Sequence, residues 1–431
     1  MRVLWFTNIP LPALAARQGG EERLDGGWLD ALRAEVCRRS DVELAVATTT
    51  SEPMAPFCDD GVMYYAVEMA PLSRRRVRRV VARWRHTQAS PGALDRCREA
   101  VTKFAPDLVH VHGTERFFGL IAGTVDIPVV ASLQGILGEY VHHFFAGLAL
   151  DDVLREAATR DFVCGHGWLH TYLDMRKGAR QERAIVRRCD AVLGRTAWDR
   201  AFAARMNPQA LYFEGPEVLR PPFYGGAWAA GSGARRPTLL AVTGPAPYKG
   251  VEMLIAAAAV LRHRGRSDID IRIAGSIVGS PMWPALSRRL RRSGVEDAVT
   301  WLGALPADGL VRELENASVF VLPSHIENSP NSLCEAMLVG TPCLAARVGG
   351  VPSLLEHGKE GLLFSDDDVE ALCDGATRLL DDEALAASCS AAARLAARRR
   401  HDPERAVRLL LEAYTAVRER YDSAAHAQRR R

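Results

Sequence analysis

The sequence predicts an α/β fold made of two Rossmann-like domains, each built around a parallel β-sheet. A chain of 431 residues is longer than one ordinary hydrophobic core supports. In both halves, short apolar segments alternate with segments of helical periodicity, which is typical of βαβ units. Between the halves lies a stretch rich in Gly, Pro, Ala and Arg, residues 220–237, which we interpret as an interdomain linker.

The first domain is predicted to span residues 1–219. Its apolar segments are short and nearly continuous, as expected of strands buried on both faces. The apolar run at the N-terminus is too short for a signal peptide and is predicted as the first strand. The predicted strands are Val3–Thr7, Val42–Ala47, Met63–Val67, Leu108–Val111, Val129–Leu133 and Ala191–Leu193.

The second domain is predicted to span residues 238–400. A final helix, within residues 401–431, is expected to pack back toward the first domain and to end in the basic tail "AQRRR". The predicted strands of this domain are Thr238–Val242, Ile269–Ala274, Val299–Leu302, Val319–Leu322, Cys343–Ala345 and Gly361–Leu363.

Composition excludes several classes of protein. The net charge of +3 is too small for a general nucleic-acid binder. The nine cysteines are scattered without a C-x-x-C pair, which favours reduced thiols in a cytosol over a disulfide framework or a zinc site. We therefore expect a cytoplasmic protein with no bound metal and no nucleic-acid partner.

The segment "SRRRVRRVVARWRH" carries seven arginines between Arg74 and Arg85. Four apolar residues recur in it at helical spacing: Val77, Val80, Val81 and Trp84. Such a helix can lie on an anionic membrane, which would place the protein on the inner face of the bilayer. The alternative is a surface helix that buries its apolar side and leaves its arginines in water.

The richest part of the second half is "HIENSPNSLCEAMLVGTP", which places Glu327 and Glu335 on either side of a Pro-Asn-Ser turn. Ser332-x-x-Glu335 fits a capping box, in which Glu335 would only bond backbone at a helix start. Capping does not explain Glu327, which precedes the turn. Upstream, "TGPAPYKG" places Lys249 between a strand and a helix, where it can neutralise a phosphate or simply be solvated.

Taken in order, these stretches resemble the retaining glycosyltransferases of the GT-B fold, family 4 (glycosyl transferases group 1), in which two Rossmann-like domains face each other across a cleft. The resemblance covers most of residues 238–395 and, more loosely, the first half. It is carried by Glu327-x7-Glu335 with "EAM", by Lys249-Gly250 before it, and by Gly349-Gly350 after it.

The resemblance implies transfer of a sugar from a UDP- or GDP-sugar to an acceptor hydroxyl with retention, in polysaccharide, lipid-linked glycan or other glycoconjugate synthesis, without a further cofactor. By match, Glu327 would contact the donor sugar and Lys249 its phosphates. Glu335 would hold the ribose hydroxyls. The backbone amides of Asn331, Ser332 and Leu333 would hold phosphate and sugar.

In the first half, candidate residues follow the predicted strands. Gly26-Gly27 of "ERLDGGWLDAL" would let backbone approach the donor diphosphate, although a plain N-terminal turn is the alternative. His112, Gln134 and Arg195 are predicted to line the cleft or contact the acceptor, although Arg195 could instead pair with Asp199.

Two departures from the family pattern keep other functions open. Gly244-Pro245 stands where the family has Gly-Arg, and Gln134 stands where it often has histidine. A degenerate GT-B protein that binds a nucleotide or a partner without catalysis is therefore one alternative. A sugar-nucleotide epimerase is another, although the Glu-x7-Glu pattern argues against it.

Overall fold

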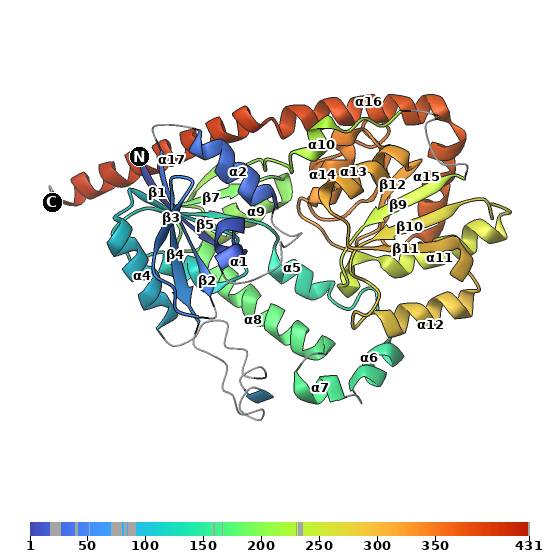
Figure 1. Ribbon diagram of the computed structural model, residues 1–431, viewed down its shortest axis with the longest axis horizontal. Coiled ribbons are helices and arrows are strands. Elements are labelled where there is room, and N and C mark those ends of the chain that lie inside the picture. The colour runs from blue at the N-terminus through green and yellow to red at the C-terminus, as the bar shows by residue number, and fades with distance from the viewer. Residues whose placement is uncertain are drawn as a thin grey trace. The chain divides into compact units, whose positions relative to one another are not determined.

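The computed structural model describes residues 1–17, 27–38, 42–50, 52–69, 80–81, 84, 92–157, 160–165, 167–229, 231 and 236–429. The chain forms two compact units, each with its own sheet (Figure 1). Unit 1 comprises Met1–Val141, Arg160–Val218 and Asp402–Arg431, and unit 2 comprises His142–Thr159 and Leu219–His401. The described residues 142–157, which lie in the first half of the sequence, thus belong to unit 2.

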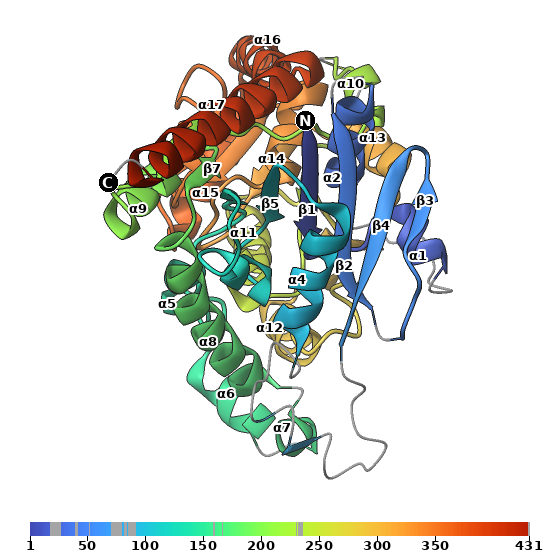
Figure 2. The ribbon, with the colours of Figure 1, turned by 90° about the vertical axis from the view of Figure 1, so that its left-hand side faces the viewer.

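The described part of unit 1 contains an eight-stranded sheet in the order β3-β4-β2-β1-β5-β6-β7-β8. All neighbours are parallel except β3 and β4, which pair antiparallel at one edge (Figure 2). The strands are β1 Arg2–Thr7, β2 Glu43–Thr50, β3 Phe57–Asp59, β4 Val62–Glu68, β5 Leu108–His112, β6 Val129–Ser132, β7 Ala191–Gly194 and β8 Leu211–Glu214.

Helices cover this sheet, and the C-terminal helix belongs to the same core. Leu410, Tyr414 and Val417 of α17 are buried in one cluster with Val3 and Trp5 of β1. The helices of unit 1 are α1 Pro12–Arg17, α2 Gly27–Cys37, α4 Ala93–Phe104, η1 Phe117–Ile121, α5 Leu137–His142, α7 Arg160–Cys164, α8 Trp168–Val186, α9 Ala197–Met206 and α17 Pro403–Arg429.

Unit 2 contains a six-stranded parallel sheet in the order β11-β10-β9-β12-β13-β14. The strands are β9 Thr238–Val242, β10 Asp270–Ala274, β11 Val299–Gly303, β12 Val319–Leu322, β13 Cys343–Ala346 and β14 Leu362–Phe364. The order reverses between β9 and β12, so this pair forms the topological switch point of a doubly wound sheet.

Helices cover both sides of this sheet (Figure 1). One of them, α10, forms inside the segment predicted as an interdomain linker. The helices of unit 2 are α6 Leu150–Ala157, α10 Pro222–Gly225, η2 Pro247–Lys249, α11 Val251–His263, α12 Trp283–Ser293, η3 Glu296–Ala298, α13 Ala307–Asn316, α14 Asn331–Val339, η4 Val351–Ser353, α15 Val369–Asp381 and α16 Glu383–Arg400.

The twelve predicted strands are all present, within two or three residues of their predicted ends. Two strands were missed, β3 and β8. Both are short edge strands, and β8 is not fully buried. Edge strands need only one covered face and so lack the continuous apolar run that marks the central strands.

Candidate functional site

The loops that follow β9 and β12 meet at the switch point of unit 2. In open parallel sheets, ligands bind outside the carboxyl ends of the strands at such a point. Lys249 lies on the first loop and Glu327 on the second. Their side chains form an ion pair, with Lys249 Nζ 2.6 Å from Glu327 Oε1. Two residues 78 positions apart in sequence are thus brought together by the order of the strands.

The pair is only partly accessible to water. The Lys249 side chain is 27% exposed and that of Glu327 is 5% exposed. Burial lowers the pKa of Lys249, but the Glu327 carboxylate and the Tyr248 phenol raise it by more, so the net shift is upward. Lys249 is therefore charged at neutral pH. A lysine ammonium has three donors, so the bond to Glu327 leaves others for a ligand.

Gly250 explains how the two loops approach so closely. Its φ of +71° lies in the left-handed region, and a Cβ at this position would come 2.0 Å from the Pro323 carbonyl oxygen. Only glycine allows this conformation and this contact together. A backbone bond completes the join, because His325 N–H donates to the Tyr248 carbonyl at 2.9 Å.

Helix α14 begins at Asn331, shortly after Glu327 in the sequence. Pro330 occupies the cap position, and within the described part of the chain no side chain caps this helix end. The predicted Ser332–Glu335 capping box is therefore wrong, because Ser332 already lies in the first helical turn. Three backbone amides of this helix start were predicted to bind the donor. That of Leu333 is already used within the helix, because its N–H donates to the Pro330 carbonyl at 3.1 Å.

Glu335 has a different partner, Arg220. The guanidinium forms a fork, with Nε 2.7 Å from Oε1 and Nη2 2.8 Å from Oε2. Burial raises the pKa of Glu335, and Arg220 offsets part of that rise. Each carboxylate oxygen keeps a further lone-pair direction, so the fork does not use all of its acceptor capacity.

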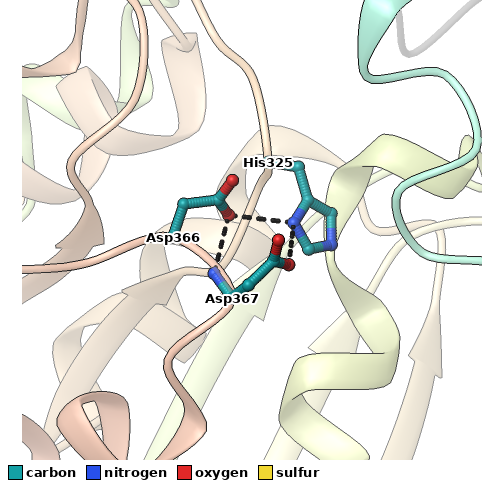
Figure 3. Close-up of side chains that lie close together, drawn as sticks. All are labelled: His325, Asp366 and Asp367. Atoms are coloured by element: carbon teal, nitrogen blue, oxygen red, sulfur yellow. Dashed lines mark hydrogen bonds and ion pairs between the residues drawn. The ribbon is translucent and has the colours of Figure 1, made fainter.

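A second polar cluster lies next to these loops, at His325 (Figure 3). Its Nε2 lies 2.6 Å from Glu252 Oε1, and its Nδ1 lies 2.9 Å from Asp366 Oδ1 and 2.9 Å from Asp367 Oδ1. The next acid, Asp368, has a different role: it caps α15 (Val369–Asp381), and its carboxylate accepts from the Ala371 N–H at 2.9 Å.

The candidate residues of unit 1 follow neighbouring strands. His112 ends β5, Gln134 follows β6, and Arg195 follows β7, so all three lie at the carboxyl edge of the sheet. The Nε2 atoms of His112 and Gln134 are buried without a hydrogen-bond partner among the described residues. Gly27 begins α2, whereas Gly26 lies outside the described residues.

The environment of His112 and Arg195 is distinctive. The His112 ring is tilted against that of His110, with ring centroids 3.8 Å apart. Burial first, and then the charges of His110 and Arg195, lower the pKa of His112. One alternative predicted that the Arg195 guanidinium pairs with Asp199, and this alternative is wrong. Its backbone N–H donates to Asp199 at 2.8 Å, while its Nη2 lies 2.7 Å from Glu217 Oε1.

Two residues of the unit 2 site were missed from sequence. Arg220 lies in the segment predicted as a linker, and His325 was assigned no role. His325 is the first residue of "HIENSPNSLCEAMLVGTP", two positions before Glu327, so its position was a usable signal. Arg220 reaches Glu335 across 115 positions, and nothing in its local sequence indicates that contact.

Comparison with known proteins gives a family match in unit 2. Residues 236–382 match the family model described as Glycosyl transferases group 1. The D-inositol 3-phosphate glycosyltransferase of Pseudarthrobacter chlorophenolicus is 34% identical over 175 residues, which is 40% of this chain and 41% of that protein. The chain thus spans about two fifths of the length of this curated relative.

Solved structures match over nearly the whole chain. Sucrose-phosphate synthase from Thermosynechococcus elongatus gives a TM-score of 0.69 at 18% identity, covering 97% of this chain and 99% of that one. Anabaena HepE, solved with UDP-glucose, gives 0.66 at 16% identity, covering 96% and 100%. The predicted fold class is confirmed: two Rossmann-like domains of the GT-B type.

Two features of the chain concern a membrane: its longest helices and its basic segment. Among the residues that the structure describes, no helix is both long enough and apolar enough to cross a bilayer. The basic segment Arg74–Arg85 lies almost entirely outside the described residues.

Proposed function

We propose that this chain is a glycosyltransferase that moves a sugar from a UDP- or GDP-sugar to an acceptor hydroxyl, with retention at the anomeric carbon. The observation that carries the proposal is the Lys249–Glu327 pair at the switch point of unit 2. This position lies within the segment that matches the glycosyltransferase family model.

The roles of the residues follow from their chemistry. Lys249 would bind the donor diphosphate, and the amides of Asn331 and Ser332 would add donors at the positive end of α14. Glu327 would accept hydrogen bonds from the sugar hydroxyls. Glu335 would accept from the ribose diol with the lone pairs that Arg220 leaves open.

In the proposed reaction, the acceptor oxygen forms a bond to the anomeric carbon while the bond from that carbon to the phosphate oxygen breaks. The acceptor proton passes to the leaving phosphate on the same face, which preserves the configuration. Negative charge grows on the diphosphate, and Lys249 with the α14 amides would stabilise it without a metal ion or further cofactor. Preorganised stabilisation of this kind is usually the largest catalytic effect.

The acceptor is proposed to be a glycan, a lipid-linked sugar or another small glycoconjugate. His112, Gln134 and Arg195 of unit 1, with the Gly26-Gly27 turn, would contribute to its binding and to the approach of the donor. We also propose that the basic segment Arg74–Arg85 holds the protein on the cytoplasmic face of a membrane. Sedimentation with anionic and neutral vesicles tests this point, because basic residues favour only the anionic ones.

A donor screen tests the enzyme proposal. UDP- and GDP-sugars are incubated with the wild-type chain, and release of UDP or GDP is measured with and without acceptor sugars. We expect release with one donor class, and a loss of at least about 100-fold in Lys249→Met and Glu327→Gln. The exposed pair Lys359–Glu356, 2.8 Å apart, supplies the matched controls Lys359→Met and Glu356→Gln.

A binding protein without catalysis is the second candidate. It is favoured by Pro245 and Gln134, which stand where the resembling family has an arginine and often a histidine. Calorimetry with UDP and GDP separates the two candidates. Nucleotide binding without turnover of any donor would support the second, and turnover would exclude it.

A further inference from the structure

His325 joins three loops at the carboxyl edge of the unit 2 sheet. It lies on the loop after β12, and its backbone N–H bonds to Tyr248 on the loop after β9. Its ring contacts Glu252 in the first turn of α11 on one side. On the other side it contacts Asp366 and Asp367 in the turn between β14 and α15 (Figure 3). The side chain is 1% exposed, so these contacts are made away from water.

The partners of His325 favour a doubly protonated ring. Both ring nitrogens face carboxylates, which only accept hydrogen bonds when ionised. Donation from both nitrogens, which this geometry accommodates, needs a proton on each and makes the ring an imidazolium. Burial lowers the pKa of His325, but Asp366 and Glu252 raise it by more, to about 10.

The position of this cation relates it to the proposed donor ligands. Lys249 follows Tyr248 directly, and Glu327 lies two residues after His325. The ring bond to Glu252 ties α11 to the β12 loop on the far side of Gly250. The Lys249 turn is thus held at both ends, by a backbone bond at Tyr248 and by a charged bond at Glu252.

We propose that His325 is a positioning residue that sets the spacing of Lys249 and Glu327 by clamping the turn between Tyr248 and Glu252. The clamp itself stands on the contacts above, whereas its effect on the donor rests on the proposed function. Nothing in this role requires His325 to touch the substrate.

A metal site is the competing interpretation, because His325, Asp366 and Asp367 offer three ligand atoms within 4.8 Å of one another. A metal needs the lone pair of Nδ1, which a proton fills in the imidazolium. Asp367 is also 71% exposed and would be a weakly held ligand. The metal interpretation therefore predicts a neutral ring, and the two can be separated by the protonation state.

The first experiment reads the ring directly. The chain is labelled with ¹⁵N-histidine, the His325 signals are assigned by their loss in His325→Gln, and the ring nitrogens are followed from pH 6 to pH 10. We expect both nitrogens to remain protonated at pH 8. A neutral ring at pH 8, or a ring signal that shifts when Mg²⁺ or Zn²⁺ is added, would overturn the clamp.

The pH range must allow for the other groups around the ring. Glu252 of α11, Asp366 and Asp367 of the β14–α15 turn, and Tyr248 of η2 all lie against it or next to it. Burial raises the pKa of Tyr248, and the opposing effect of Lys249 is smaller, so the phenol stays neutral at pH 8. The charge of the ring itself therefore decides the result.

The second experiment measures the clamp without any ligand. Hydrogen exchange is compared between wild type and His325→Gln for peptides covering residues 245–252. We expect faster exchange there, and no change in His263→Gln, an exposed histidine at the other end of α11. If His325→Gln does not fold, the experiment uses Glu252→Gln instead, because this variant weakens the same bond. Unchanged exchange in the folded variant would contradict the clamp.

The third experiment asks whether His325 acts through Lys249. UDP or GDP affinity is measured for wild type, His325→Gln, Lys249→Met and the double variant. We expect His325→Gln to weaken binding about tenfold in the wild type and less than about twofold beside Lys249→Met, because coupled residues are not additive. Equal losses in both backgrounds would refute action through Lys249. If the wild type binds neither nucleotide, the proposed function fails while the exchange result still decides the clamp.

Discussion

The two glutamates of the Glu-x7-Glu pattern differ in their partners, and this difference assigns them different tasks. Glu327 is paired with a lysine, a compact charge on a flexible stem that can turn to a phosphate. Glu335 is held by the planar fork of Arg220, which fixes its orientation. The first pair is suited to rearrange around a ligand, and the second to stay in place.

Removal of Arg220 should therefore cost stability. Arg220→Met leaves a buried carboxylate without its fork, and we expect the free energy of unfolding to fall by about 3 kcal/mol. Denaturant unfolding measures it. The control is Arg312→Met, an exposed arginine on the neighbouring helix α13. A loss no larger than that of the control would show that Glu335 does not need Arg220.

His325 makes a stability prediction with a definite sign. Its pKa is about 6.5 in an unfolded chain and about 10 in the folded one. A raised pKa stabilises the fold fully below pH 6.5, and the contribution disappears as the pH rises through 10. The difference in unfolding free energy between wild type and His325→Gln should thus shrink between pH 6 and pH 10, by on the order of 3 kcal/mol. A difference that grows with pH would mean that the folded ring is neutral.

At the scale of elements, the sequence predicts the central strands well because each is short, apolar and buried on both faces. It predicts the start of α14 less well. Ser332 and Glu335 have capping-box spacing, yet the helix begins at Asn331, because Pro330 fits the position before the first turn and Glu335 is drawn to Arg220. The charge of Arg220, 115 positions away, therefore outweighs the capping-box pattern of Ser332 and Glu335. Neither Arg220 nor the Glu252–His325 bond can be inferred from spacing alone.

The loop after β9 offers a test with two glycines. Gly250→Ala would place a Cβ 2.0 Å from the Pro323 carbonyl at a φ of +71°, so we expect a loss of at least about 2 kcal/mol and weaker nucleotide binding. Gly244→Ala lies on the same loop with nothing within 4 Å of the new Cβ. Its effect on unfolding should be within about 0.5 kcal/mol. Similar losses in both would show that the Gly250 contact is not limiting.

At the scale of the molecule, chain order and unit membership differ. Residues 142–157 come before two of the three segments of unit 1 in sequence but belong to unit 2, where Asp152 lies 2.5 Å from Arg288 of α12. Conversely, α17 comes last and belongs to unit 1. Long-range charged and aromatic contacts decide these memberships, and strand periodicity carries no information about them.

The attachment of α17 depends on one buried hydroxyl. Tyr414 Oη accepts from Trp5 Nε1 at 3.0 Å and lies 2.6 Å from His110 Nδ1. The other ring nitrogen of His110, Nε2, is hydrogen-bonded to Ser132 Oγ. Tyr414→Phe keeps the ring but strands two buried polar groups, so we expect unit 1 to lose about 2 kcal/mol. Tyr421→Phe, on the same helix but partly exposed, is the control. Because Trp5 lies against Tyr414, loss of α17 contacts should be visible in tryptophan fluorescence during denaturation. An equal, small effect of both substitutions would mean that apolar packing alone holds the C-terminal helix.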